Sequence, residues 1–346
     1  MNEWERFTNS VHGKPIDHTP LALIGTNRFY ASLWNENLFD ILHDPHKMID
    51  VQLKTFDKFP EVTFIPGIWP DYSVGVLSSF GCQIKWQKST MPQVLKEPLF
   101  TDEDIQKMTI PDPHHDGFMP WYLQTLHMFL ERSSKYQNNC HFLWSFGPGE
   151  LASYLWGSCK FLGDLIQKQD LMEFFLEKVT RAIIEWLKAQ QEVNPFADGI
   201  LMTDDISGLL SEKLYRKMLM PFQQKIVQAF PDHLIVFHND TKSNHILQAI
   251  KETGVHVFNI GKTTDLALAE SVFGNDVSLM GNLDPLDLLI KGSKEEIIAQ
   301  AKNCFEKVKN NPRFILSAGG GLNEGMPSSS MEALLSAVQS SKQQEV

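Results

Sequence analysis

The chain has 346 residues, of which 42% are hydrophobic and 21% are charged, and this is the balance of an ordinary globular protein. Its net charge of −11 disfavours non-specific binding to nucleic acid or to an acidic membrane surface. Four scattered cysteines without a C-x-x-C pair argue against a structural zinc module and a disulfide framework, and suit a reducing cytoplasm. Because the sequence lacks both an apolar signal core and a run of about 18 apolar residues, we expect a soluble cytoplasmic protein.

Short runs rich in Val, Ile, Leu and Phe recur along the chain, and each ends in Gly, Pro, Asn or Asp. These runs are apolar nearly throughout rather than alternating, which is typical of strands that are covered on both faces. In chain order they are residues 21–25, 61–67, 141–147, 198–205, 233–240, 254–261, 277–284 and 313–321.

Helical patterns lie between these runs, and the clearest are residues 170–193, 211–230 and 293–311. Apolar residues recur there at three- and four-residue spacing. Ser211 and Ser293 are suitable N-caps for the second and third of these helices. Pro221 should kink the second helix, because proline lacks the N–H that an interior helical position needs.

This alternation of strand and helix implies parallel strands with right-handed crossovers. We therefore predict an α/β fold, a single-domain (β/α)8 TIM barrel over residues 1–346 that is closed. Residues 68–140, between the second and third strands, form an excursion over one mouth and contain SFGCQIKWQ, a candidate hairpin. A doubly wound sheet is the alternative, but its usual G-x-G-x-x-G turn is absent.

Barrel enzymes place their active sites at the carboxyl ends of the strands. The residues that follow the apolar runs are therefore the candidates, although turns favour Asn, Asp and Gly in any case. We assign catalytic roles to Asp71, Asp204 and Asp205, substrate binding to Arg28, Asn27, Asn239, Asn282, Gly319 and Gly320, and metal binding to His238, Asp240 and Glu324.

His238 and Asp240 are the sharpest pair in this set. Strand residues two apart point to the same face, so both side chains can reach one ligand or one metal. The alternative is a turn in which Asp240 caps the helix that follows. Asp204 and Asp205 are adjacent and point in opposite directions, so we expect only one of them to enter the site.

Arg28 and the glycine run at 319–321 have weaker signals. A guanidinium grips a carboxylate with two hydrogen bonds, so Arg28 is a candidate carboxylate anchor, with a surface ion pair as the alternative. The glycines let backbone amides approach a ligand closely, or else they only form a turn.

The whole chain resembles the uroporphyrinogen decarboxylase superfamily, which also contains zinc- and corrinoid-linked methyltransferases. The resemblance is carried by RFTNSVHGKPIDHTP, GLLSEKLYRKMLMPFQQKIV, MGNLDP and FILSAGGGLNEGMPSSSMEAL. It implies the barrel fold nearly from end to end. Decarboxylases of this type are often homodimers.

The decarboxylases carry an Arg-rich opening for a substrate with many carboxylates, and here the matching stretch LIGTNRFY keeps only Arg28. Asp71 lies near the distance before Phe80–Gly81 at which these enzymes carry their key Asp. The methyltransferases hold zinc through a His-x-Cys strand end and a later Cys. Here His238 is kept, whereas Asp240 and Gly320 stand where the two cysteines would be.

Three functions follow from this comparison. The first is a methyltransferase-like enzyme that moves a methyl group from a corrinoid, carried on a partner protein, to a small-molecule acceptor. Its His/Asp site would hold zinc or another divalent metal. The second is a metal-free decarboxylase in which Arg28 orients the carboxylate of the substrate. The third is a barrel that only binds a ligand.

Overall fold

We describe the protein from a computed structural model, which places residues 1–132, 140–309 and 311–341. Each of the eight apolar runs contains a strand, so the strand predictions are confirmed. These strands are β1 (Ala22–Ile24), β2 (Thr63–Ile65), β5 (Phe142–Phe146), β6 (Gly199–Thr203), β7 (Leu234–Asn239), β8 (Val257–Ile260), β9 (Ser278–Leu283) and β10 (Phe314–Ala318).

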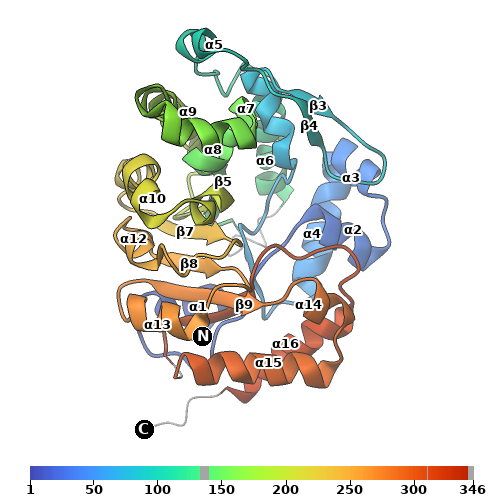
Figure 1. Cartoon of the computed structure of the whole chain (residues 1–346). Helices are drawn as coiled ribbons and strands as arrows, with labels where there is room; N and C mark the ends of the chain where they lie inside the picture. The colour runs from blue at the N-terminus through green and yellow to red at the C-terminus, as the bar shows by residue number, and fades with distance from the viewer. Residues whose placement is uncertain (133–139, 310, 342–346) are drawn as a thin grey trace.

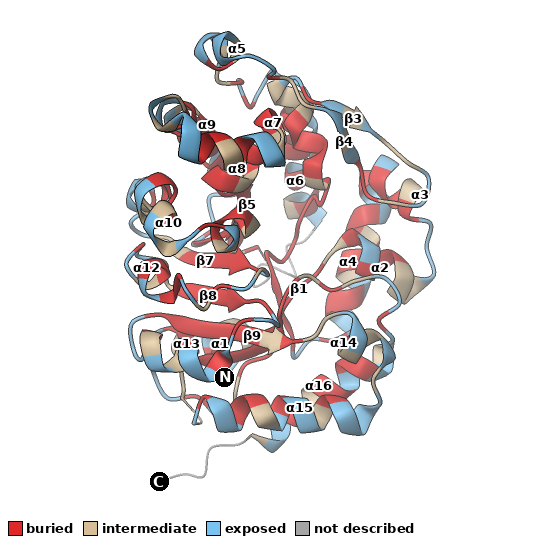
Figure 2. Ribbon diagram, in the orientation of Figure 1, coloured by how far each residue is buried: buried red, intermediate tan, exposed pale blue. Residues whose placement is uncertain are grey.

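The strands are parallel and follow the order of a (β/α)8 barrel, which confirms the predicted fold class (Figure 1). Strands β5 to β10 form one six-stranded sheet, and β1 and β2 form a second sheet. The two sheets meet at a bridge between Leu21 and Leu316, where the Leu316 N–H donates to the Pro20 carbonyl at 2.9 Å. Figure 2 shows β7 and β8 as buried ribbons, as expected for strands with helices outside and a filled interior.

The prediction of a closed barrel is wrong, because the barrel is open between β2 and β5. Within the described chain no strand pairing joins these two strands, and we call this opening the seam. Side chains fill this seam instead. The rings of Trp69 and Trp144 lie 5.3 Å apart between their centroids. Gln52 bonds both the N–H and the carbonyl of Trp69, at 3.0 and 2.7 Å. Gln190 bonds the N–H and the carbonyl of Trp144 in the same way, at 3.1 and 2.8 Å.

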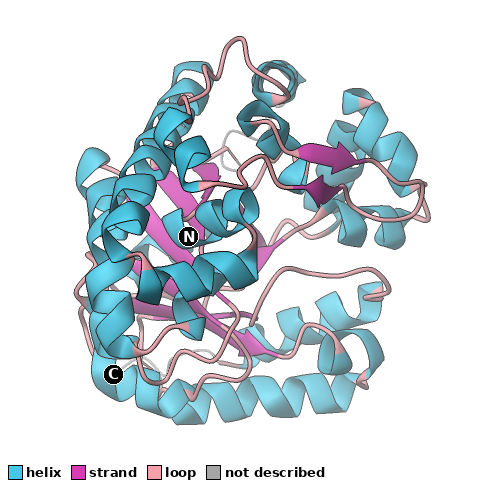
Figure 3. Ribbon diagram, turned by 45° about the horizontal axis from the view of Figure 1, so that its top comes forward, coloured by secondary structure: helices cyan, strands magenta, loops and turns pink. Residues whose placement is uncertain are grey.

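The helices surround the sheets (Figures 1 and 3). They are α1 (Glu3–Val11), α2 (Asn27–Trp34), α3 (Leu38–His43), α4 (Pro45–Lys58), α5 (Asp102–Lys107), α6 (Met119–Arg132), α7 (Pro148–Trp156), α8 (Ser158–Gln167), α9 (Gln169–Val193), α10 (Glu212–Met218), α11 (Met220–Ala229), α12 (Leu247–Lys251), α13 (Leu266–Phe273), α14 (Asp287–Lys291), α15 (Lys294–Lys307) and α16 (Ser328–Ser340), with the 3-10 helices η1 (Ser73–Phe80) and η3 (Asp205–Leu209).

The three helices predicted most clearly are present. Helix α9 covers the first almost residue for residue. The second divides into α10 and α11 at Leu219, and Pro221 lies in the first turn of α11, where its missing N–H costs no hydrogen bond. The Ser211 and Ser293 side chains accept bonds from Leu214 N–H and Glu296 N–H, so both predicted N-caps are confirmed. Residue 310, at the end of the third prediction, lies outside the described residues.

Residues 68–140 contain the hairpin expected from SFGCQIKWQ. Strands β3 (Gln83–Lys85) and β4 (Gln93–Lys96) pair antiparallel, and Figure 3 shows them apart from the main sheet. The segment also includes η1, α5 and α6, and residues 133–139 lie outside the described residues. Within the described chain, no helix is long and apolar enough to cross a membrane.

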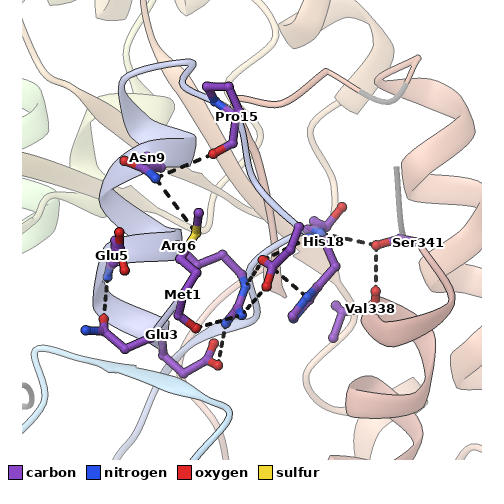
Figure 4. Close-up of polar contacts among 12 residues, drawn as sticks. Met1, Glu3, Glu5, Arg6, Asn9, Pro15, His18, Val338 and Ser341 are labelled. Carbon is purple, nitrogen blue, oxygen red and sulfur yellow. Dashed lines mark hydrogen bonds and ion pairs between the residues drawn. The ribbon is translucent and has the colours of Figure 1, made fainter. Parts of the chain in front are cut away.

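The opening motif has a structural role at the N-terminal side of the barrel (Figure 4). Buried Arg6 donates to Asp17 through Nε and Nη2, at 2.6 and 2.9 Å, and also pairs with Glu3. The Arg6 hydrogen bonds hold the pKa of Asp17 well below its usual range. The Ser10 hydroxyl donates to the Pro312 carbonyl at 2.6 Å, so α1 is tied to the chain just before β10.

Candidate active site

Polar side chains from neighbouring strands meet at the carboxyl end of the six-stranded sheet. Thr203 at the end of β6 is the register partner of His238 on β7, and Asp205 and Asp240 lie just beyond these two strands. One ligand atom from each of Asp205, His238 and Asp240 lies within 4.8 Å of the others. His238 is buried and Asp240 is exposed, so the group lies where the interior opens to solvent.

Asn259 on β8 fixes the tautomer of His238. The Asn259 Nδ2 group donates to the carbonyls of Met280 and Ala318, at 3.0 and 3.2 Å. Its Oδ1 atom therefore faces His238 Nδ1 at 2.6 Å, and this nitrogen must carry the proton. The Nε2 lone pair of the neutral ring is then left for a ligand, an arrangement typical of metal-binding histidines.

Asp204 turns away from this group into the protein, as expected for one member of the adjacent pair. Its carboxylate accepts from Gly149 N–H at 2.9 Å and from Gln223 Nε2 at 3.1 Å, and burial raises the pKa of Asp204 to about 7. A Cβ atom at Gly147 would lie 2.5 Å from the Asp204 Cβ, so the close approach of these two segments requires glycine there.

Glu150 is a member of the site that the sequence analysis did not single out. It lies in the first turn of α7, and its buried Oε2 atom has no hydrogen-bond partner within the described chain. Burial, with the charges of Asp205 and Asp204, raises the pKa of Glu150 well above its usual range. Burial and the Asp205 carboxylate also raise the pKa of Asp240. The sequence signal that could have identified Glu150 was its position in GPGE, directly after the predicted strand at 141–147.

Arg28 and Asp71 lie in a pocket of about 590 Å³. Tyr154 also lines this pocket. Burial raises the pKa of Tyr154, and the charges of Glu150 and Asp205 raise it further. The pocket therefore borders the carboxylates of the His238 group. Its other lining residues are Thr26, Trp69, Ser73, Val74, Met91, Pro92, Gln93, Val94, Glu97, Ser153, Ser158, Gly321 and Asn323.

Asp71 is buried and is held by the turn that follows β1. It accepts from the Asn27 N–H at 2.9 Å, and the Asn27 side chain donates to the Asp71 carbonyl at 3.0 Å. Burial raises the pKa of Asp71 to about 6, although the backbone bonds of Asn27 and Ser73 and the charge of Arg28 act in the opposite direction. Asn27 therefore holds Asp71 in place with both its backbone and its side chain.

This raised pKa predicts a pH dependence of stability. An unfolded Asp releases its proton near pH 4, whereas folded Asp71 releases it near pH 6. Between these values the folded state binds more protons, so the free energy of unfolding falls as the pH rises through this window. Asparagine does not titrate, so the Asp71→Asn variant lacks this loss. We expect its free energy of unfolding, relative to that of the unchanged protein, to increase as the pH rises from 4.5 to 6 and to stay constant above pH 7. Urea denaturation at each pH measures this, and a difference that does not vary between pH 4.5 and 6 would contradict it.

Two of the predicted asparagines make bonds within the protein. Asn239 donates to the Asp204 carbonyl at 2.8 Å and accepts from Thr241 and Ser243, so it positions the ends of β6 and β7. Asn282 donates to the Thr264 carbonyl at 3.0 Å and lines a separate groove beside α13 to α15. The structure does not bring Asn282 to the pocket that holds Arg28.

Of the remaining predicted residues, the structure brings Gly320 to the His238 group but not Glu324. A Cβ on Gly319 would lie 2.5 Å from the backbone nitrogen of Lys262, so glycine at this position permits close packing of two loops. A Cβ on Gly320 would lie 3.8 Å from Asp240 Oδ2, and its φ of 146° is a conformation that favours glycine. Glu324 is apart from this group and lines a depression with Arg28 and Lys88.

Comparisons with known proteins relate nearly the whole chain to one family and one fold. A family model described as uroporphyrinogen decarboxylase (URO-D) matches residues 2–341. The uroporphyrinogen decarboxylase of Geobacter sulfurreducens is 24% identical over 341 residues, which cover 93% of this chain and 94% of the relative. That of Coxiella burnetii (strain Dugway 5J108-111) is 23% identical over 356 residues and covers 97% and 94%. A methyltransferase from Methanosarcina mazei superposes with a TM-score of 0.82 at 22% identity, over 98% of this chain and 99% of that one.

Proposed function

Because the chain belongs to the uroporphyrinogen decarboxylase (URO-D) family, we propose that it is a methyltransferase-like member of that family, which moves a methyl group from a corrinoid to a small acceptor. The observation that carries this proposal is the group of Asp205, His238 and Asp240 at the barrel mouth. The fold that the chain shares with the Methanosarcina mazei methyltransferase is consistent with it. The corrinoid would arrive on a partner protein.

The donor set of this group fits a divalent cation. His238 offers the Nε2 lone pair, and Asp205 and Asp240 offer carboxylate oxygens. The pKa values of Asp240 and Glu150 are raised because these carboxyl groups are partly desolvated and lie close to other carboxylates. A bound cation would reduce this repulsion. Nitrogen and oxygen ligands accept zinc but select it less strongly than thiolates do.

A divalent metal in this position would supply a Lewis acid that lowers the pKa of the acceptor group. The protein itself would contribute orientation and shielding. Asn259 would hold His238 in one tautomer, and Asp204, packed against Gly149, would fix the loop that carries Asp205. We also propose that the 68–140 segment covers the mouth of the barrel, because the β3–β4 hairpin contributes Gln93 and Val94 to the pocket.

The direct test is demethylation of methylcobalamin, followed by its change in absorbance, with the purified protein, zinc and a panel of small thiols and amines. We expect turnover with at least one acceptor and none with Asp205→Asn/Asp240→Asn. A protein that binds no divalent metal and demethylates nothing in the presence of zinc would refute the proposal.

Asn259→Ala tests the role of the residue behind the imidazole. This variant removes the acceptor that fixes the His238 tautomer but leaves all three ligands in place. Loss of such an outer partner typically costs about 10–100-fold in metal affinity, and we expect a loss of that size. Isothermal titration with zinc measures it, and unchanged affinity would mean that His238 binds no metal through Nε2.

Asp71 favours a second candidate, a metal-free decarboxylase. It is a buried acid with a raised pKa, it lies in the same pocket as Arg28, and a group of this kind can donate a proton or stabilise a developing cation. In that case Arg28→Ala should abolish release of CO2, and His238→Ala should leave it intact. The methyltransferase proposal instead makes His238 essential for turnover, so the His238→Ala variant distinguishes the two.

A further inference from the structure

The 590 Å³ pocket is lined by charged residues of both signs. Arg28, near the start of α2, is exposed, and no hydrogen bond or ion pair joins its side chain to another described residue. Glu97, directly after β4, is half-buried and is also without a partner among the described residues. Arg28 and Glu97 therefore offer one pocket two opposite charges whose hydrogen-bonding capacity is still available to a ligand.

The two charges come from different walls of the pocket. Arg28 lies in the first turn of α2, whereas Glu97 directly follows the β3–β4 hairpin. Asp71 adds a second carboxylate, which accepts hydrogen bonds from the backbone N–H groups of Asn27 and Ser73 and whose pKa, raised by burial, is partly lowered by the charge of Arg28. A ligand that spans the pocket therefore meets a guanidinium on one wall and the Glu97 carboxylate on another.

We propose that this pocket binds a small zwitterion of the α-amino acid type, with its carboxylate on Arg28 and its ammonium on Glu97. This inference rests on the proposed function, because it names the class of the methyl acceptor. Trp69, Met91 and Tyr154 provide apolar surface for the rest of the molecule.

Charge complementarity distinguishes this ligand from the alternatives. A guanidinium grips a carboxylate with two parallel bonds, and a carboxylate accepts strongly from an ammonium group. A ligand with a single charge would leave Arg28 or Glu97 without a partner as it displaces water, and this costs affinity. A polyanion would be repelled by Glu97 and Asp71, so the pocket is poorly suited to a substrate with many carboxylates.

Three matched probes test the inference by isothermal titration calorimetry. L-Methionine carries both charges and the methyl group that transfer would leave behind, 4-(methylthio)butanoate lacks the ammonium, and 3-(methylthio)propylamine lacks the carboxylate. We expect methionine to bind at least about tenfold more tightly than either, the usual scale for one charge-assisted contact. The Arg28→Ala variant loses the contact with the carboxylate, so it should no longer prefer methionine over the amine. The Glu97→Gln variant loses the contact with the ammonium, so it should no longer prefer methionine over the butanoate.

Glu103→Gln, which removes an exposed carboxylate of α5 outside the pocket, is the control and should keep both preferences. Equal affinity for the three probes, or preferences that survive in both pocket variants, would overturn the inference. Methylcobalamin demethylation separates this failure from failure of the proposed function. Turnover without a preference for methionine refutes only the zwitterion, whereas selective binding without turnover for any acceptor refutes only methyl transfer.

Discussion

Replacing His238 by alanine is expected to remove divalent metal from the protein and to stop methyl transfer. The imidazole is the only nitrogen donor of the Asp205, His238 and Asp240 group, and Asn259 orients it. Because this change removes a ligand, its effect on metal affinity should exceed the roughly 10–100-fold typical of an outer partner. Plasma mass spectrometry of untagged protein, after incubation with zinc and desalting, should find near-stoichiometric metal only in the unchanged chain.

His233→Ala is the matched control for this experiment. His233 immediately precedes the same strand, at its opposite end, and its Nε2 atom lies 2.9 Å from Gln191 Nε2. The control should retain metal and turnover. Metal that remains bound in the His238 variant would place the site elsewhere, and absence of metal from every variant would leave the metal-free decarboxylase as the better reading.

Gln190→Ala is expected to destabilise the fold strongly, although Gln190 lies outside the site. It deprives the buried N–H and carbonyl of Trp144 of their partner at the open edge of β5. A buried polar group without a partner costs about 1–3 kcal/mol, so the free energy of unfolding should fall by roughly 2–5 kcal/mol. Urea denaturation measures this loss. Gln52→Ala, which removes the corresponding partner of Trp69, should have an effect of similar size.

Gln191→Ala separates the loss of these bonds from any change in helix propensity. It makes the same substitution in the same helix one residue later, where the side chain is half-buried and contacts His233. We expect its stability to change by less than about 0.5 kcal/mol. If the Gln190 and Gln191 variants were equally stable, the side chain of Gln190 would not be what holds this edge.

Much of the fold followed from local sequence patterns. Each run of β-branched and aromatic residues became a strand, and the convergence of His238 with Asp205 follows from the rule that parallel strands end at one edge. The seam could not be predicted in this way. Gln52 and Gln190 resemble ordinary helix residues, and only the tertiary fold brings them to the backbones of Trp69 and Trp144.

The site itself was predicted only in part, for a similar reason. The sequence indicated that one member of the Asp204–Asp205 pair enters the site but not which one, because this depends on the Gly147–Gly149 turn that receives Asp204. Asn259 lies in the predicted strand run 254–261, but the pattern of that run does not reveal its role as the partner of His238. That role requires the register of β7 on β8, which pairs these two residues.

The open seam also bears on how new specificities arise in such a barrel. The loops after β1 and β2 supply Arg28 and Asp71, whereas the six-stranded sheet supplies His238 and its neighbours. On one side the two sheets meet through side chains, Trp69 against Trp144, rather than through a hydrogen-bond ladder. Substitutions at that contact would alter the spacing between the two halves of the site without breaking either sheet. Evolution could thus adjust the barrel to longer or shorter substrates while its reactive centre stays intact.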